Sequence, residues 1–114
     1  MKTSCHRLEI FEASEKAVAG AAKSWWQANG YSLYPPMCNT ILSSFRGSHF
    51  GIMDNQTRRI MQVIFKPMGT GTAVSVHHHT SRILCLVGVM QGDLLQRETD
   101  SFLQYIREYV AANY

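Results

Sequence analysis

The sequence predicts an α+β fold, with a single antiparallel sheet and two helices packed on one of its faces. The chain has 114 residues and is 46% hydrophobic, which is enough to build one core. Apolar residues recur at helical spacing near each end of the chain. Between these segments they alternate with polar residues in short runs bounded by turn residues. The order is strand, helix, several strands and a long C-terminal helix, so we expect one α+β domain over residues 1–114.

The first two elements are a strand and a helix. Residues His6–Phe11 alternate between apolar and polar side chains, which predicts a strand. Ser14 is a favourable N-cap, and Gly30 favours the left-handed backbone conformation that ends many helices, so we expect a helix between them. The apolar face of this helix contains Trp25 and Trp26, of which we expect one in the core and one at its margin.

The middle of the chain alternates with a period of two residues, which predicts a series of antiparallel strands. These predicted strands are Tyr31–Tyr34, Asn39–Arg46, His49–Met53, Arg59–Lys66, Thr72–Thr80 and Ile83–Met90. The glycine-containing segment 67–71 joins two of them as a hairpin loop. The last predicted strand is apolar throughout, so we expect it to be central or covered on both faces.

A long helix closes the chain. Asp93 and Gln96 have the spacing of a helix-capping box. Leu95, Phe102 and Ile106 then lie on an apolar stripe that continues towards Tyr114. We expect this helix to pack on the same face of the sheet as the first helix.

The charge is modest and unevenly distributed. Charged residues make up 17% of the chain and the net charge is +3. Residues 31–91 carry five cations against Asp54 alone, a net charge of +4. These cations form a candidate cationic patch: Arg46, Arg58, Arg59, Lys66 and Arg82. Nucleic-acid binding there is an open alternative, but aromatic residues for base stacking are sparse, which favours a solvated rim.

The cysteines and the longest apolar run help to predict where the protein resides in the cell. Cys5, Cys38 and Cys85 have no metal-type spacing, and no signal-peptide pattern is visible. The longest apolar run has eight residues, too few to span a bilayer. We therefore expect free thiols, a cytoplasmic protein and no membrane partner.

Two helices can cover only one face of the sheet, so the other face must meet water or a partner. The side chains expected there form an apolar patch rimmed by cations and histidines, which is typical of a contact surface. The predicted interaction face is Leu42, Arg46, Ile60, Gln62, Ile64, Lys66, Ser75, His77 and His79. We expect it to bind a second copy of the chain or a partner protein.

The run His77-His78-His79 is a candidate metal site. On a strand, His77 and His79 project from the same face about 6.5–7 Å apart, and such a pair can supply two imidazoles to zinc. His78 points to the opposite face, where we expect a hydrogen bond to backbone. A complete site needs further ligands that the spacing does not identify. We therefore expect no cofactor, with zinc as an open alternative.

No catalytic constellation is visible in the sequence. Carboxylates are sparse and Cys85 lies in an apolar run, where a thiol stays protonated. The segment Gly69–Thr72 lacks the ending of a phosphate-binding loop. We therefore expect that the protein is not an enzyme.

The order of elements resembles two known architectures. The helix Ala17–Gly30 leading into Tyr31, the segment 46–51 and the long helix after Asp93 resemble TATA-binding-protein-like α+β domains. This resemblance implies the layout alone, because no functional residue of that family is carried over. The long final helix over a sheet also resembles helix-grip domains, the START-like lipid binders. That resemblance implies a cavity between helices and sheet.

These observations favour a non-catalytic interaction module that associates through its uncovered sheet face. The alternative is binding of a small apolar molecule or lipid between the helices and a curved sheet. The six methionines and the apolar run Ile83–Met90 suggest this alternative.

Overall fold

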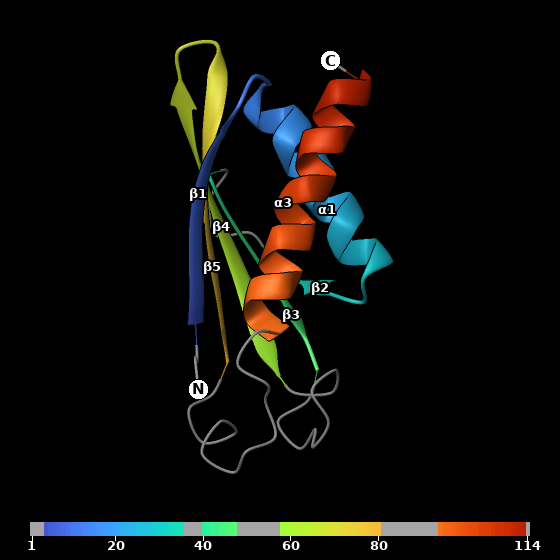
Figure 1. Ribbon diagram of the computed structural model, residues 1–114. Coiled ribbons are helices and arrows are strands. Elements are labelled where there is room, and N and C mark those ends of the chain that lie inside the picture. Colours follow the sequence, from blue (N-terminus) through green and yellow to red (C-terminus); the bar gives the residue numbers. More distant parts are fainter. Residues whose placement is uncertain (1–3, 36–39, 48–57, 81–93, 114) are drawn as a thin grey trace.

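The computed structural model describes residues 4–35, 40–47, 58–80 and 94–113. These residues form a five-stranded sheet and two helices, so the predicted α+β fold class is confirmed (Figure 1). The strands are β1 (Ser4–Phe11), β2 (Ser32–Leu33), β3 (Ile41–Arg46), β4 (Arg59–Met68) and β5 (Gly71–Thr80), and the helices are α1 (Glu15–Ala28) and α3 (Leu94–Asn113).

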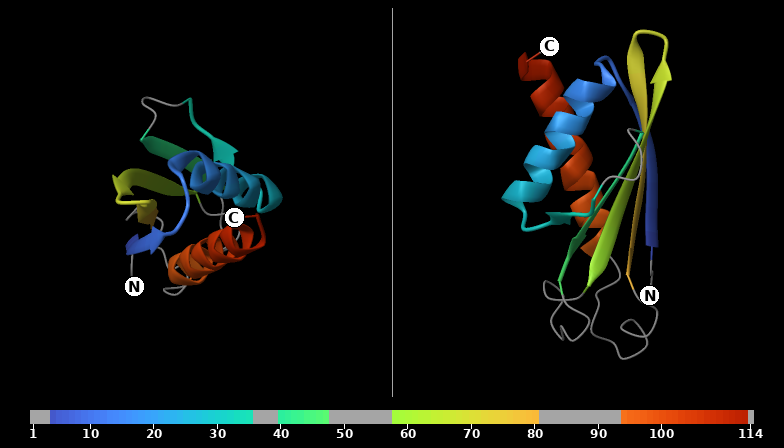
Figure 2. Two further views of the ribbon diagram at one scale, coloured as in Figure 1. Left: turned by 90° about the horizontal axis from the view of Figure 1, so that it is seen from above. Right: turned by 180° about the vertical axis from the view of Figure 1, so that it is seen from behind.

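All four neighbouring pairs of strands are antiparallel, in the order β1-β5-β4-β3-β2. Both helices lie on the same side of the twisted sheet, with α3 beside β1 and α1 towards β2 (Figure 2). The sheet therefore has an inner face that meets the helices and an outer face opposite them. Neither described helix combines the length and the apolarity that crossing a membrane requires.

Several element boundaries differ from the predictions. β2 contains two residues rather than four. The β4–β5 ladder continues to the pair Met68–Gly71, so the connection is a two-residue turn and not the predicted loop 67–71. Gly69 adopts the positive φ (+62°) that such a turn requires. The predicted strands 49–53 and 83–90 lie outside the described residues, as do Cys38 and Cys85, whereas Cys5 is a buried free thiol.

The apolar part of the core joins α1 to α3. α1 begins after Ser14, whose hydroxyl accepts a hydrogen bond from the Ala17 amide, as predicted. Trp25 and Trp26 are both buried, so the expectation that one lies at the margin is wrong. Both rings contact Phe102 of α3, with centroids 5.4 and 5.8 Å from its ring. These aromatic contacts fix α1 against α3.

The structure divides the predicted interaction face between the two sides of the sheet. Paired residues of antiparallel strands project from the same face. Leu42 pairs with Val63, and Arg46 pairs with Arg59, so both Leu42 and Arg46 lie on the inner face and their predicted orientation is wrong. The other predicted members lie on the outer face in alternating positions: Ile60, Gln62, Ile64, Lys66, Ser75, His77 and His79.

Close packing of the β4–β5 turn against β1 gives a stability prediction. A Cβ atom at Gly71 would lie 2.3 Å from the carbonyl oxygen of Phe11, so the backbone must shift to admit it. We expect Gly71→Ala to lower the free energy of unfolding by about 1–3 kcal/mol, measured by urea denaturation with tryptophan fluorescence.

Gly20→Ala is the matched control. Gly20 is exposed within α1 and a Cβ there meets nothing within 4 Å. Alanine should therefore stabilise the helix by about 1 kcal/mol. Equal effects of the two substitutions would contradict the proposed contact between Gly71 and Phe11.

Candidate functional site

The inner face of the sheet changes from apolar to polar along its length. Near the β4–β5 turn it carries Phe65 and Val74, which pair across the strands and are buried. The opposite end of the sheet lies beside the start of α3 (Figure 1). There the inward positions become polar. These buried or half-buried polar residues are Ser44, Arg46, Arg59, His78 and Thr80. A polar end to a protein core requires a full set of hydrogen-bond partners.

A buried ion pair holds this end of α3 on the sheet. Arg59 is the first residue of β4 and its side chain is 1% exposed. Its Nε lies 2.5 Å from Oε1 of Glu98, and its Nη2 lies 3.0 Å from Oε2, which makes the contact bidentate. Burial opposes the charge of the guanidinium. The hydrogen bond and charge of Glu98 outweigh burial, so the pKa of Arg59 is raised above its ordinary value.

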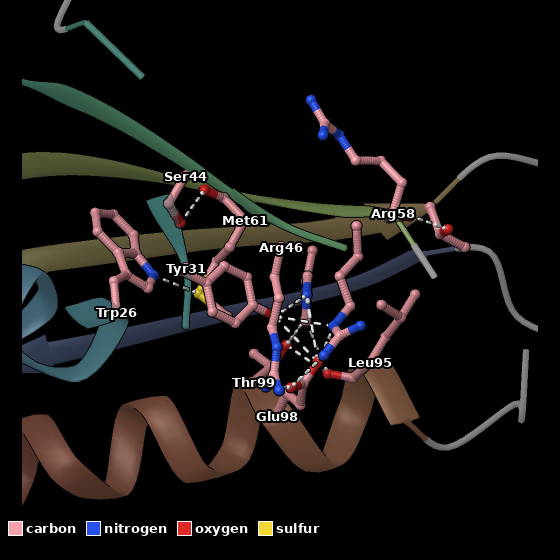
Figure 3. A network of polar contacts seen from close by, with 12 residues as sticks. Trp26, Tyr31, Ser44, Arg46, Arg58, Met61, Leu95, Glu98 and Thr99 are labelled. Atoms are coloured by element: carbon pink, nitrogen blue, oxygen red, sulfur yellow. Dashed lines mark hydrogen bonds and ion pairs between the residues drawn. The ribbon is translucent and has the colours of Figure 1, made fainter. Parts of the chain in front are cut away.

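Tyr31 connects the ion pair to a buried histidine (Figure 3). The Tyr31 hydroxyl lies 3.0 Å from Oε1 of Glu98 and 2.9 Å from Nε2 of His78. Burial, and then the charge of Glu98, raise the pKa of this hydroxyl well above its ordinary value. Tyr31 is therefore neutral, and its single hydroxyl proton is shared between two neighbours, of which it can serve one at a time.

The other nitrogen of His78 faces α3. Nδ1 lies 3.2 Å from the carbonyl oxygen of Leu95 and 3.1 Å from the hydroxyl of Thr99. A carbonyl can only accept, so we assign the proton to Nδ1 and leave Nε2 as the acceptor. The predicted backbone hydrogen bond of His78 is thus confirmed. Burial lowers the pKa of His78 to about 4, so the ring is neutral at pH 7.

Arg46 completes this group, which we call the polar cluster: Tyr31, Arg46, Arg59, His78, Glu98 and Thr99. Nη1 of Arg46 lies 3.7 Å from Oε2 of Glu98. The Arg46 side chain is 34% exposed, whereas that of Arg59 is 1% exposed. Two guanidinium groups face one carboxylate and His78 is neutral, so the polar cluster has a net charge of +1. Arg46 is therefore the cation that can reach a ligand.

The predicted cationic patch does not form one surface. Arg59 is buried against Glu98, and Arg46 lies on the inner face beside it. Arg58 lies elsewhere, with its guanidinium 4.1 Å from the centroid of the Phe45 ring. Lys66 projects from the outer face, and Arg82 lies outside the described residues. The prediction of a single patch is wrong because alternate residues of a strand face opposite sides of the sheet.

The predicted metal ligands lie on the outer face. His77 stacks on His6 of β1, with ring centroids 4.0 Å apart, and His6 was not among the residues singled out from the sequence. His79 projects from the same face two residues further along β5. In the described ranges, no three histidine, cysteine, aspartate or glutamate side chains form a group suited to a metal ion. Zinc binding at His77 and His79 stays a prediction.

Sequence reasoning did not identify Tyr31, Glu98 and Thr99 as site residues. A signal for Glu98 was present, because it lies three residues after Leu95 and four before Phe102, on the apolar stripe of the final helix. A carboxylate at such a position needs a buried partner. Nothing in the local sequence indicates that the partner is Arg59.

Comparison with known proteins places the fold. No protein-family model matches the sequence, and no curated protein matches it. Protein MLL2253 from Mesorhizobium loti has a solved structure with a TM-score of 0.71 and 9% identity, over 97% of this chain and 98% of that chain. The structure of protein CV1439 from Chromobacterium violaceum has a TM-score of 0.68 and 8% identity. The match covers 96% of this chain and 98% of that chain.

Ara h 8.0201 is a third structural neighbour. Its structure has a TM-score of 0.55 and 11% identity, over 96% of this chain and 98% of that chain. These likenesses show a small α+β fold of the helix-grip type, in which a long C-terminal helix packs on an antiparallel sheet. At such low identity they show the fold alone. The resemblance to TATA-binding-protein-like domains stays a prediction.

Burial of His78 predicts a dependence of stability on pH. The folded pKa of about 4 lies below the unfolded value of about 6.5, so the unfolded chain binds more protons between these values. The contribution of neutral His78 to the free energy of unfolding is fully present above about pH 6.5 and is lost as the pH falls towards 4. We expect a loss of roughly 3 kcal/mol from this group.

The measurement is urea denaturation at a series of pH values, for the wild type and for His78→Gln. The variant should have a flatter profile between pH 6.5 and 4, because glutamine does not titrate. His79→Gln is the control, since His79 is exposed. If His79→Gln flattened the profile and His78→Gln did not, the assignment to His78 would be wrong.

Proposed function

We propose that this protein is a non-catalytic binding module for a small, mainly apolar molecule that carries a carboxylate or carbonyl group. In this proposal the ligand lies between α3 and the inner face of the sheet, with its polar group at the polar cluster. The observation that carries the proposal is a buried, charged network at a helix–sheet interface that is otherwise apolar.

The energetics of the network support a role beyond stability. A buried ion pair contributes little net stability, because removing both charges from water costs as much as their attraction gains. Aromatic contacts of α1 with α3 already stabilise the core. Retaining Arg59 and Glu98 in this core is therefore better explained by recognition of a ligand than by stability.

The charge of the polar cluster supports an acceptor or an anion as the recognised group. The net charge is +1, and Arg46 is partly exposed and forms an ion pair of 3.7 Å with Glu98. A ligand carboxylate can pair with Arg46 without displacing the bidentate contact of Arg59 with Glu98. Leu42, Met61 and Leu95 are the buried apolar residues at this end, each at most 6% exposed, so the hydrocarbon part would have to replace some of their present contacts.

The helix-grip fold adds fold-level support. In the structure, the long helix α3 packs on the inner face of an antiparallel sheet. The prediction of a small-molecule binder was the alternative at the level of sequence, and it fits this fold better than the favoured interaction module does.

A partner protein or a second copy remains a second candidate. It is favoured by two exposed apolar side chains on the outer face of β1, because Leu8 is 68% exposed and Ile10 is 55% exposed. The homodimer stays a prediction.

Titration with decanoate tests the proposed site by isothermal calorimetry. We expect saturable binding to the wild type, and at least tenfold weaker binding to Arg46→Ala, which loses a charge-assisted hydrogen bond of roughly 1.5–3 kcal/mol. Lys66→Ala is the control, because it removes a cation of the outer face. Absence of binding to the wild type, or equal weakening by both substitutions, would overturn the proposal.

A further inference from the structure

A groove lies on the outer face of the sheet, opposite the polar cluster. It has a volume of about 600 Å³ and is lined by Tyr34, Pro35, Ile41, Ser43, Ile60 and Gln62. This volume is within the range of sites for small organic molecules. In β4, Ile60 lies between Arg59 and Met61, which both face the inner side. The sheet therefore separates this groove from the site proposed above.

One wall of the groove is held in place by several contacts. The backbone amide of Tyr34 donates to the carbonyl oxygen of Ser43 at 2.9 Å, which ties the segment after β2 to β3. The Tyr34 ring lies 4.6 Å from the Phe45 ring, measured between centroids. Arg58 lies over Phe45 and donates to the Tyr34 hydroxyl at 3.3 Å. These contacts fix the wall before any ligand binds, which lowers the entropy cost of binding.

The floor of the groove combines apolar area with two polar side chains. Ile41 and Ile60 are half-buried. Ser43 and Gln62 form a cross-strand pair between β3 and β4, so their side chains lie side by side. In the part of the chain that the structure describes, neither side chain hydrogen-bonds to another described residue. Each can donate and accept a hydrogen bond.

The charge around the groove restricts what it can hold. None of the described residues that line it is a carboxylate, and the described charge beside its wall is the guanidinium of Arg58, which already lies over Phe45. A cationic ligand would have no counter-ion, whereas a neutral or weakly acidic molecule meets no opposing charge. The aromatic wall and the apolar part of the floor favour a flat ring system.

We propose that this groove is a second binding site, specific for a flat aromatic molecule with a hydroxyl or carbonyl group at its edge. The ring lies against Tyr34 and Pro35 and over Ile41 and Ile60. The polar edge exchanges hydrogen bonds with Gln62 and Ser43. This site goes beyond the binding module proposed above, because it lies on the other face of the sheet.

Titration of ¹⁵N-labelled protein with 2-naphthol, followed by two-dimensional NMR, tests the site. We expect saturable shifts of the Gln62 side-chain amide and of the Ser43 backbone amide, with half-saturation below about 1 mM. Shifts confined to His78, Thr99 and Leu95 would assign the ligand to the inner face and overturn this inference. Absence of saturable shifts would also overturn it, without bearing on decanoate binding.

Two isoleucines of β4 provide a matched pair of variants. Ile60 and Ile64 are both half-buried on the outer face, but Ile60 lines the groove and Ile64 does not. We expect Ile60→Ala to weaken 2-naphthol binding at least fivefold and Ile64→Ala to leave it within twofold. Gln62→Leu removes the hydrogen bonds with less loss of packing, and it should also weaken binding. Equal affinity of Ile60→Ala, Gln62→Leu and the wild type would contradict the proposal.

Discussion

The bidentate contact between Arg59 and Glu98 is the interaction on which the position of α3 depends. It joins the first residue of β4 to the first turns of α3, with the Arg59 side chain 1% exposed and that of Glu98 15% exposed. Such a pair is tolerated only when its remaining hydrogen-bonding capacity is satisfied. The Tyr31 hydroxyl lies within hydrogen-bond distance of both the carboxylate and His78, and the other nitrogen of His78 reaches the backbone of α3. Rotation of the helix would therefore leave several buried polar groups without partners.

The two ends of the inner face therefore differ in chemistry. One end is closed by aromatic packing, in which Trp25, Trp26 and Phe102 fix the two helices against each other. The other end carries charge and hydrogen-bonding groups, of which Arg46 is the partly exposed member. Because the aromatic end stabilises the fold, the polar end is available for the ligand recognition that we propose. The outer face differs because it carries a groove, whose wall is fixed by Tyr34, Phe45 and Arg58.

Strand alternation predicted the faces of β4 and β5, but not the face of β3. A shift of one residue moves every side chain of a strand to the opposite face, and no turn signal in residues 31–58 fixed the register of β3. Leu42 and Arg46 were therefore assigned to the wrong side. The pairing of Arg59 with Glu98 joins residues 39 positions apart in the sequence, so it depends on how α3 lies on the sheet. Local patterns of charge or hydrophobicity contain no such information.

The central claim is that the buried ion pair orients α3 and serves the proposed ligand recognition, without adding net stability. The most direct test is the double variant Arg59→Met with Glu98→Leu, which replaces both charges by apolar groups of similar volume. Its free energy of unfolding and its affinity for decanoate should be measured together. We expect stability at or above that of the wild type, with affinity at least tenfold lower because Glu98 no longer holds Arg46 and Tyr31 in position for the ligand carboxylate. A clear loss of stability with unchanged affinity would contradict the claim and make the ion pair structural.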